Sequence, residues 1–162
     1  MMILTLLLAV AAQVTPTPKL PPANAMPPPG TEEAAVLAPI NALFAGIANQ
    51  DGAAVLTRVM PRGNLTAVAE KADGTRTIRE LSWADFAGNL KPGPRRMEER
   101  FIGQPAIEID GDIAMVWGNY VFLVDGKTSH CGVNHADLVR DGGQWKILNI
   151  TWTQRTTGCD AQ

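Results

Sequence analysis

Hydrophobic residues in the first part of the chain recur with the three- and four-residue spacing of an amphipathic helix. They follow residues 31–33 (Thr-Glu-Glu), a capping residue and two acids that favour a helix start. Pro39 lies inside the pattern and predicts either a kink or the true first turn of this helix. The apolar positions form one face, and they are Val36, Leu37, Ile40, Leu43, Phe44 and Ile47.

Capping residues predict two shorter helices. Asp51 caps the first, which runs through Val59 and is stopped by Pro61. Ser82 caps the second, which extends to Asn89 and carries an acid three residues after the cap. We therefore expect three helices in the domain.

The remaining pattern predicts strands joined by Asp-Gly turns. Residues 64–71 and 75–81 flank Asp73-Gly74 and are expected to form a hairpin. A meander of four longer strands follows, over residues 95–109, 112–124, 128–140 and 144–155. Because long antiparallel strands twist and curl, we expect the helices to close the concave side of the sheet.

One strand of this meander, residues 112–124, is apolar on both faces. Tyr120 and Phe122 lie on one face, and Trp117 and Val121 lie on the other. Helices can cover only one of these faces, so the second face needs another cover. This pattern predicts a homodimer that forms sheet to sheet.

The first thirty residues predict export. Residues 1–12 are an apolar run with a small-x-small pattern at Ala9-Val10-Ala11, which is typical of a signal peptide. The run is too short to span a bilayer, so no stable membrane insertion is expected after its cleavage. Residues 13–30 hold seven of the twelve prolines and predict an extended linker. The expected location is periplasmic or secreted, with a folded domain over residues 31–162.

Composition excludes two broad classes of protein. With 46% hydrophobic residues and a net charge of −2, the chain differs from disordered proteins, which are poor in apolar residues and highly charged. Because its net charge is close to zero, the chain also lacks the positive electrostatic field that nucleic-acid binding needs. We expect no nucleic-acid partner. Arg95, Arg96 and Arg100 form the one basic cluster, and because Glu98 and Glu99 interrupt it, we interpret it as a solvated strand end.

The order of elements and the last third of the chain resemble the nuclear transport factor 2-like superfamily, which includes the SnoaL-like cone barrels. The segments that carry the resemblance are Trp117–Phe122, Asp125–Lys127, His130–His135, Gly143–Ile147, Thr153–Arg155 and Gly158-Cys159. They are most similar to the lumazine-binding subgroup, in which an Asp commonly stands where this chain has Asn134. That difference weakens any carried-over role for a carboxylate at this position.

The resemblance implies an α+β fold of the cystatin-like type. In it a cone-shaped, curled antiparallel sheet packs against three helices and leaves a pocket between them. The superfamily includes steroid isomerases, dehydratases, polyketide cyclases and domains that only bind or dimerise, so fold alone does not determine the function.

Residues at even spacing on the strands predict a small-molecule site in this pocket. His130 and Asn134 share a face with Gly132, and they would be polar groups beside Tyr120 and Phe122 of the neighbouring strand. Alternatively, these polar groups satisfy buried backbone groups. A further candidate, Trp83, is expected on the short helix as a lid or a core anchor.

Catalytic candidates are few. His130 could act in the pocket, and His135 with Asp137 could form a dyad on the opposite face. Same-face neighbours on one strand lie about 7 Å apart, which strains a direct hydrogen bond and favours a solvated pair. Because His130 and His135 point to opposite faces and no zinc-type Cys spacing exists, we expect neither a metal nor another cofactor.

In an exported chain, Cys131 and Cys159 are expected to form a disulfide. The favoured function is an exported domain that binds a small apolar ligand without catalysis, with the ligand's identity left open. One alternative is a small isomerase, dehydratase or cyclase that uses a pocket His. The other is a structural dimerisation domain.

Overall fold

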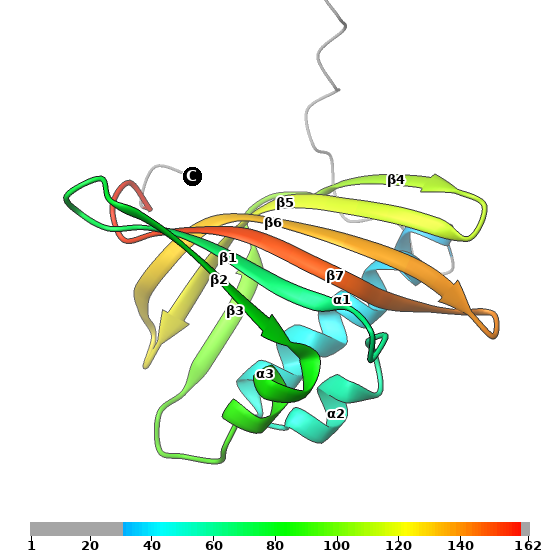
Figure 1. Ribbon diagram of the computed structural model, residues 1–162, viewed down its shortest axis with the longest axis horizontal. Helices are drawn as coiled ribbons and strands as arrows, with labels where there is room; N and C mark the ends of the chain where they lie inside the picture. Colours follow the sequence, from blue (N-terminus) through cyan, green and yellow to red (C-terminus); the bar gives the residue numbers. More distant parts are fainter. Residues whose placement is uncertain (1–30, 160–162) are drawn as a thin grey trace, which may run out of the picture.

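The computed structural model describes residues 31–159. The predicted signal peptide (1–12) and linker (13–30) lie outside these described residues. Within them, three helices lie on one side of a curled sheet of seven strands (Figure 1). The predicted α+β class, with the helices against the concave side of the sheet, is confirmed.

The first helix, α1, covers Glu32–Ala48 and begins where the sequence predicts. The side chain of Thr31 accepts a hydrogen bond from the backbone N–H of Ala34, which caps the helix. The helix continues through Pro39, which is buried, so this proline does not mark the first turn.

The two shorter helices are also capped as expected. Asp51 caps α2 (Gly52–Leu56), and Ser82 caps α3 (Trp83–Asn89). The first of them ends earlier than predicted, because Val59 leaves the helix and forms a bridge with Ile147 of the last strand.

Two short strands form the predicted hairpin, and the others form the meander. The hairpin consists of β1 (Asn64–Glu70) and β2 (Arg76–Ser82). The meander consists of β3 (Met97–Phe101), β4 (Ala106–Asp110), β5 (Ile113–Val124), β6 (Lys127–Asp141) and β7 (Gln144–Arg155).

The predicted single strand over residues 95–109 is wrong, since the chain breaks it into β3 and β4. Gly103 adopts a left-handed backbone with φ of 73°, and Pro105 has no N–H to donate to a sheet. Both pieces pair with β5, β3 along its second half and β4 along its first. At the junction Gly118 of β5 leaves room for Phe101, whose ring would lie 2.8 Å from a Cβ there.

The sheet is mixed rather than wholly antiparallel. Its strand order is β2-β1-β7-β6-β5-β3, and β4 also pairs with β5. One neighbouring pair, β1 and β7, is parallel, with Leu65 opposite Ile150. This pairing joins segments far apart in sequence, so no turn signal could have predicted it.

The core lies between α1 and the concave face of the sheet. The buried face of α1 packs against buried residues of the long strands, including Val116, Leu138 and Ile147. Burying each such side chain contributes about 1.5–3 kcal/mol to stability. The core residues of α1 are those that the sequence pattern predicts: Val36, Leu37, Ile40, Leu43 and Ile47.

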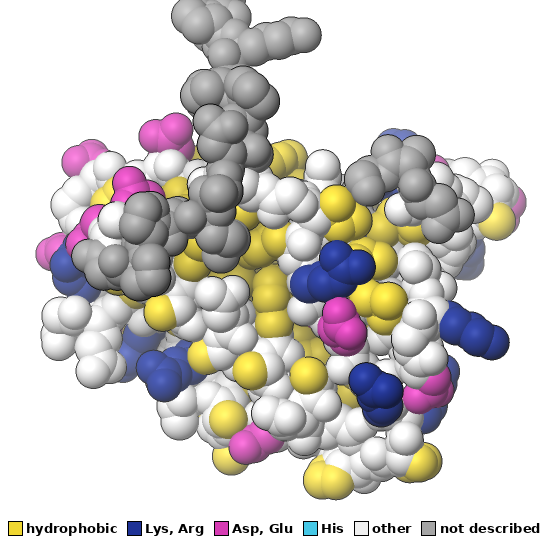
Figure 2. Space-filling model, turned by 180° about the vertical axis from the view of Figure 1, so that it is seen from behind, with side chains coloured by type: hydrophobic (Ala, Val, Ile, Leu, Met, Phe, Trp, Pro, Cys, Tyr) yellow, Lys and Arg dark blue, Asp and Glu magenta, His cyan; other side chains and the backbone are white. Residues whose placement is uncertain are grey.

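One face of the molecule is mixed in charge. On the side seen in Figure 2, Lys and Arg side chains are interspersed with Asp and Glu rather than gathered by sign. No helix within residues 31–159 is long and apolar enough to cross a membrane.

Candidate functional site

A cavity of about 200 Å³ lies between the concave face of the sheet and the helices. Its walls are mainly apolar. Helices α1 and α3 contribute one side of it, and strands from both ends of the sheet contribute the other. The apolar lining residues are Leu43, Ile47, Leu65, Phe86, Leu90, Met97, Phe122, Ile150 and Trp152.

Four of the five residues predicted for a ligand site line this cavity: Tyr120, Phe122, His130 and Asn134. The fifth, Trp83, does not. It is fully buried, and its indole N–H donates a 3.0 Å hydrogen bond to the backbone oxygen of Leu148. Its ring meets Phe86 edge to face, with centroids 6.1 Å apart, and Phe86 itself faces the cavity. Of the two roles expected for Trp83, the structure shows the core anchor.

A carboxyl group from the predicted solvated strand end is part of the cavity wall. Glu99 on β3 lines the cavity, and the side-chain amide of Asn134 donates a 2.7 Å hydrogen bond to its Oε1. Within residues 31–159 no other group donates to this carboxyl, so Oε2 has no hydrogen-bond partner. Burial raises the pKa of Glu99 to about 7, and the Asn134 amide opposes that rise.

The interpretation of residues 95–100 as a solvated strand end is wrong for Glu99. Side chains alternate along β3, so Met97, Glu99 and Phe101 are partly buried while Glu98 and Arg100 face solvent. Glu98 pairs with Arg100 at 3.2 Å on that outer face. The apolar residues two positions to either side of Glu99 were the signal that could have found it.

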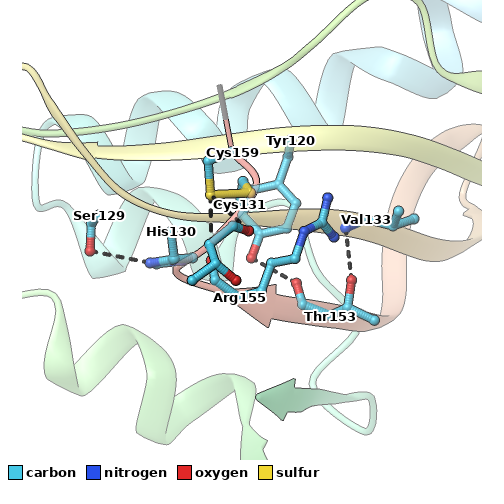
Figure 3. Close-up of a disulfide and its surroundings, with 9 residues drawn as sticks. Tyr120, Ser129, His130, Cys131, Val133, Thr153, Arg155 and Cys159 are labelled. Atoms are coloured by element: carbon cyan, nitrogen blue, oxygen red, sulfur yellow. Dashed lines mark hydrogen bonds between the residues drawn. A yellow bond between two sulfur atoms is a disulfide. The ribbon is translucent and has the colours of Figure 1, made fainter. Parts of the chain in front are cut away.

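Tyr120 is held by a hydrogen bond across the sheet. Its hydroxyl donates a 3.0 Å hydrogen bond to the backbone oxygen of Thr153 on β7 (Figure 3). The residue opposite Tyr120 on the intervening strand β6 is Gly132. A Cβ at Gly132 would lie 1.9 Å from that same oxygen. Burial raises the pKa of Tyr120, and the charge of Glu99 adds to the rise. The hydroxyl therefore stays protonated and positions the ring.

His130 contributes an uncharged aromatic ring to the cavity wall. Its ring stacks on Phe122 with centroids 4.7 Å apart and planes 11° apart. Its Nδ1 lies 3.3 Å from the hydroxyl of Ser129. Burial lowers the pKa of His130, so the imidazole is uncharged at neutral pH.

The alternative dyad lies away from the cavity. His135 and Asp137 belong to the opposite face of β6, and neither lines the cavity. Their Nε2 and Oδ1 atoms are 3.5 Å apart, closer than the strand spacing led us to expect, because both side chains extend beyond their Cβ atoms. The His135 ring also packs against Trp117, with centroids 5.7 Å apart. A ligand in the cavity cannot contact this pair.

Cys131 and Cys159 form the predicted disulfide, which joins the end of the described chain to β6 (Figure 3). Their Cα atoms lie 5.6 Å apart. The bond ties the segment after β7 to the residue that follows His130 on β6. Among residues 31–159, no three His, Cys, Asp or Glu side chains are grouped in a way that could hold a metal ion.

The sequence matches no protein-family model and no curated protein. The structure, by contrast, is similar to many solved structures. A nuclear transport factor 2-like protein from Cytophaga hutchinsonii superposes with a TM-score of 0.59 at 14% identity, covering 76% of this chain and 98% of that one. A nuclear transport factor 2-like superfamily protein from Salmonella enterica gives 0.55 at 16% identity, covering 76% and 92%.

A third solved structure, from Nostoc punctiforme and described as cystatin-like, gives a TM-score of 0.57 at 9% identity, covering 77% of this chain and 92% of that one. Identities this low establish the fold alone. The chain therefore has the nuclear transport factor 2-like fold, on which both ligand-binding proteins and enzymes are built.

Proposed function

We propose that this domain binds a small, mainly apolar molecule in the cavity between the sheet and the helices. The observation that carries the proposal is the polar arrangement inside an apolar cavity: beside the Asn134 amide, Glu99 keeps one carboxyl oxygen that has no hydrogen-bond partner among residues 31–159. Small-molecule sites typically combine apolar walls with a few placed polar groups. The apolar part of the ligand would contact the walls, and its polar group would face Glu99.

The proposed function includes export and a place in the lumazine-binding subgroup. Export is supported by the disulfide between Cys131 and Cys159, because such bonds persist in oxidising compartments. The subgroup is supported by the resemblance over residues 117–159, which leaves the ligand's identity open.

A second candidate function is acid–base catalysis in the same cavity, with Glu99 in place of a pocket His. The observation that favours it is a carboxyl with a pKa of about 7 on the wall of an apolar cavity. Such a group could accept a proton from one position of a substrate and return it to another, as in an isomerase. His130, which is neutral and stacked on Phe122, would shape the substrate's site.

We also propose that the domain is a homodimer formed through the convex face of its sheet. Ile113 and Trp117 on this face are 59% and 52% exposed, unusually high for large apolar side chains. A second copy would cover them and leave the cavity on the concave side open to its ligand.

Ligand binding can be tested by filling the cavity. In Leu90→Trp the larger side chain would occupy the space, and Leu56→Trp is the matched control because Leu56 is 43% exposed on α2. A fragment library of small aromatic compounds should include members that raise the melting temperature of the wild type and of Leu56→Trp, but not of Leu90→Trp. Compounds that stabilise all three proteins equally, or none of them, would refute the proposal.

A further inference from the structure

Resting on the proposed function, we propose that the cavity selects apolar molecules that carry a protonated amine, with the ammonium group bound to Glu99. The proposal starts from the charges around the cavity. Among the described residues that line it, Glu99 is the one carboxyl, and none is Lys or Arg. The cavity therefore favours a cationic ligand and disfavours an anionic one.

The hydrogen bonds around Glu99 indicate that the ligand carries a hydrogen-bond donor. Asn134 occupies Oε1, whereas Oε2 has no partner in the described part of the chain. The hydroxyl of Tyr120 donates its one hydrogen to the backbone oxygen of Thr153, so it cannot also donate to Glu99. An ammonium N–H would fill the open acceptor position, and a hydrogen bond between two charged groups is the stronger kind.

The aromatic lining favours the same ligand class. Phe86, Tyr120, Phe122 and Trp152 all line the cavity, and a cation close to an aromatic face is stabilised by the negative charge of the ring face. These rings also supply apolar contact for the rest of the ligand. A cavity of about 150 Å³ admits benzene, so about 200 Å³ accommodates one ring with a short chain.

Binding of such an amine depends on the protonation state of Glu99. The titratable groups that face Glu99 from other strands are Tyr120 on β5 and His130 on β6, and both are neutral at pH 7. The positive charge of Arg155 on β7 lowers the pKa of Tyr120, and Arg155 lies outside the cavity lining. The helices α1 and α3 contribute only apolar residues to the lining. Glu99 is thus the group whose ionisation changes the charge of the site around pH 7.

Three compounds of similar size separate the effect of ligand charge on affinity from the effect of ligand shape. They are 2-phenylethylamine, 2-phenylethanol and phenylacetate. Calorimetric titration of the wild type at pH 8.5 should give an affinity for the amine about tenfold above that for the alcohol, and phenylacetate should bind least. The affinity for the amine should fall about tenfold between pH 8.5 and 5.5 as Glu99 takes up its proton, because the protonated carboxyl is as uncharged as the amide of Glu99→Gln. The affinity for the alcohol should stay level.

Variants of two neighbouring glutamates complete the test. Glu99→Gln should reduce the affinity for the amine at least about tenfold at pH 8.5 and leave that for 2-phenylethanol unchanged. Glu98→Gln removes the same charge on the outer face of β3 and should change neither. If the alcohol binds as tightly as the amine, or if Glu99→Gln binds the amine normally, the amine inference is wrong and the proposed function stands. If none of the three probes binds the wild type and the fragment library also yields no ligand, both are wrong.

Discussion

The side-chain amide of Asn134 on β6 donates a 2.7 Å hydrogen bond to the carboxyl of Glu99 on β3, although β5 lies between these two strands in the sheet. The sheet curls strongly (Figure 1). Because of this curl, side chains of the non-adjacent strands β3 and β6 can meet over its concave face. The result is a polar pair on the wall of an otherwise apolar cavity.

Replacing Asn134 with Asp should raise the pKa of Glu99 above its value of about 7. The substitution removes an amide that favours the ionised carboxyl and puts a second carboxyl in its place, and like charges at this distance disfavour ionisation. The measurement is a carboxyl titration by carbon-detected NMR. A pKa for Glu99 that is unchanged or lower in Asn134→Asp would contradict the hydrogen bond between the two side chains.

The raised pKa of Glu99 makes stability depend on pH. The folded protein binds this proton with a pKa of about 7, against 4.5 for a free carboxyl, so Glu99 lowers the stability as pH rises from 4.5 to 7. The full difference amounts to about 3 kcal/mol.

Chemical denaturation at pH 4.5 and pH 8 measures this effect against Glu99→Gln, which cannot titrate. On moving to the lower pH, the wild type should gain up to about 3 kcal/mol relative to this variant. Because both proteins retain His130 and its titration, the comparison isolates Glu99. Equal pH profiles for the two proteins would show that the carboxyl is not perturbed.

Substituting Gly132 with Ala should destabilise the fold. Its Cβ would lie 1.9 Å from the backbone oxygen of Thr153, the atom that accepts the Tyr120 hydroxyl. Relieving that contact requires a backbone shift, for which about 1–3 kcal/mol is typical. Gly88→Ala is the matched control, because its Cβ would meet nothing within 4 Å. Urea unfolding should separate the two variants clearly, and a Gly132→Ala protein as stable as Gly88→Ala would contradict this geometry.

Reducing the disulfide between Cys131 and Cys159 should lower the free energy of unfolding by about 3 kcal/mol, as expected for a closed chain segment of 28 residues. Urea unfolding with and without a phosphine reductant measures the loss. The Cys159→Ser variant should match the reduced wild type and should not respond to the reductant. A reductant effect of the same size in that variant would show that the effect arises elsewhere.

The homodimer proposed through the convex face should dissociate when Trp117 is replaced by Glu, because a charge would then be buried in the interface. Ile78→Glu serves as the control, since Ile78 is 70% exposed on β2, at the edge of the sheet. Sedimentation velocity at micromolar concentration should give dimers for the wild type and Ile78→Glu, and monomers for Trp117→Glu. A monomeric wild type would refute the proposal.

Local signals in the sequence were sufficient for most of the secondary structure. Thr31, Asp51 and Ser82 cap helices where they were expected to, because a capping side chain satisfies the backbone of its own first turn. Asp-Gly turns located the hairpins for a similar reason, since Gly126 and Gly142 adopt the left-handed backbone that these turns require. The break between β3 and β4 was missed, although Gly103 and Pro105 were its local signals.

By itself, the sequence determined the helices, the hairpins, the apolar face of α1 and the placement of His130 and Asn134 on one face of their strand, because each of these depends on near neighbours in the chain. Only the tertiary structure decided that β1 lies parallel to β7, that Trp83 is a core residue and that Glu99 faces the cavity beside Asn134. These depend on contacts between residues far apart in sequence. The curl of the sheet brings such residues together, and no spacing along the chain records how far a sheet curls.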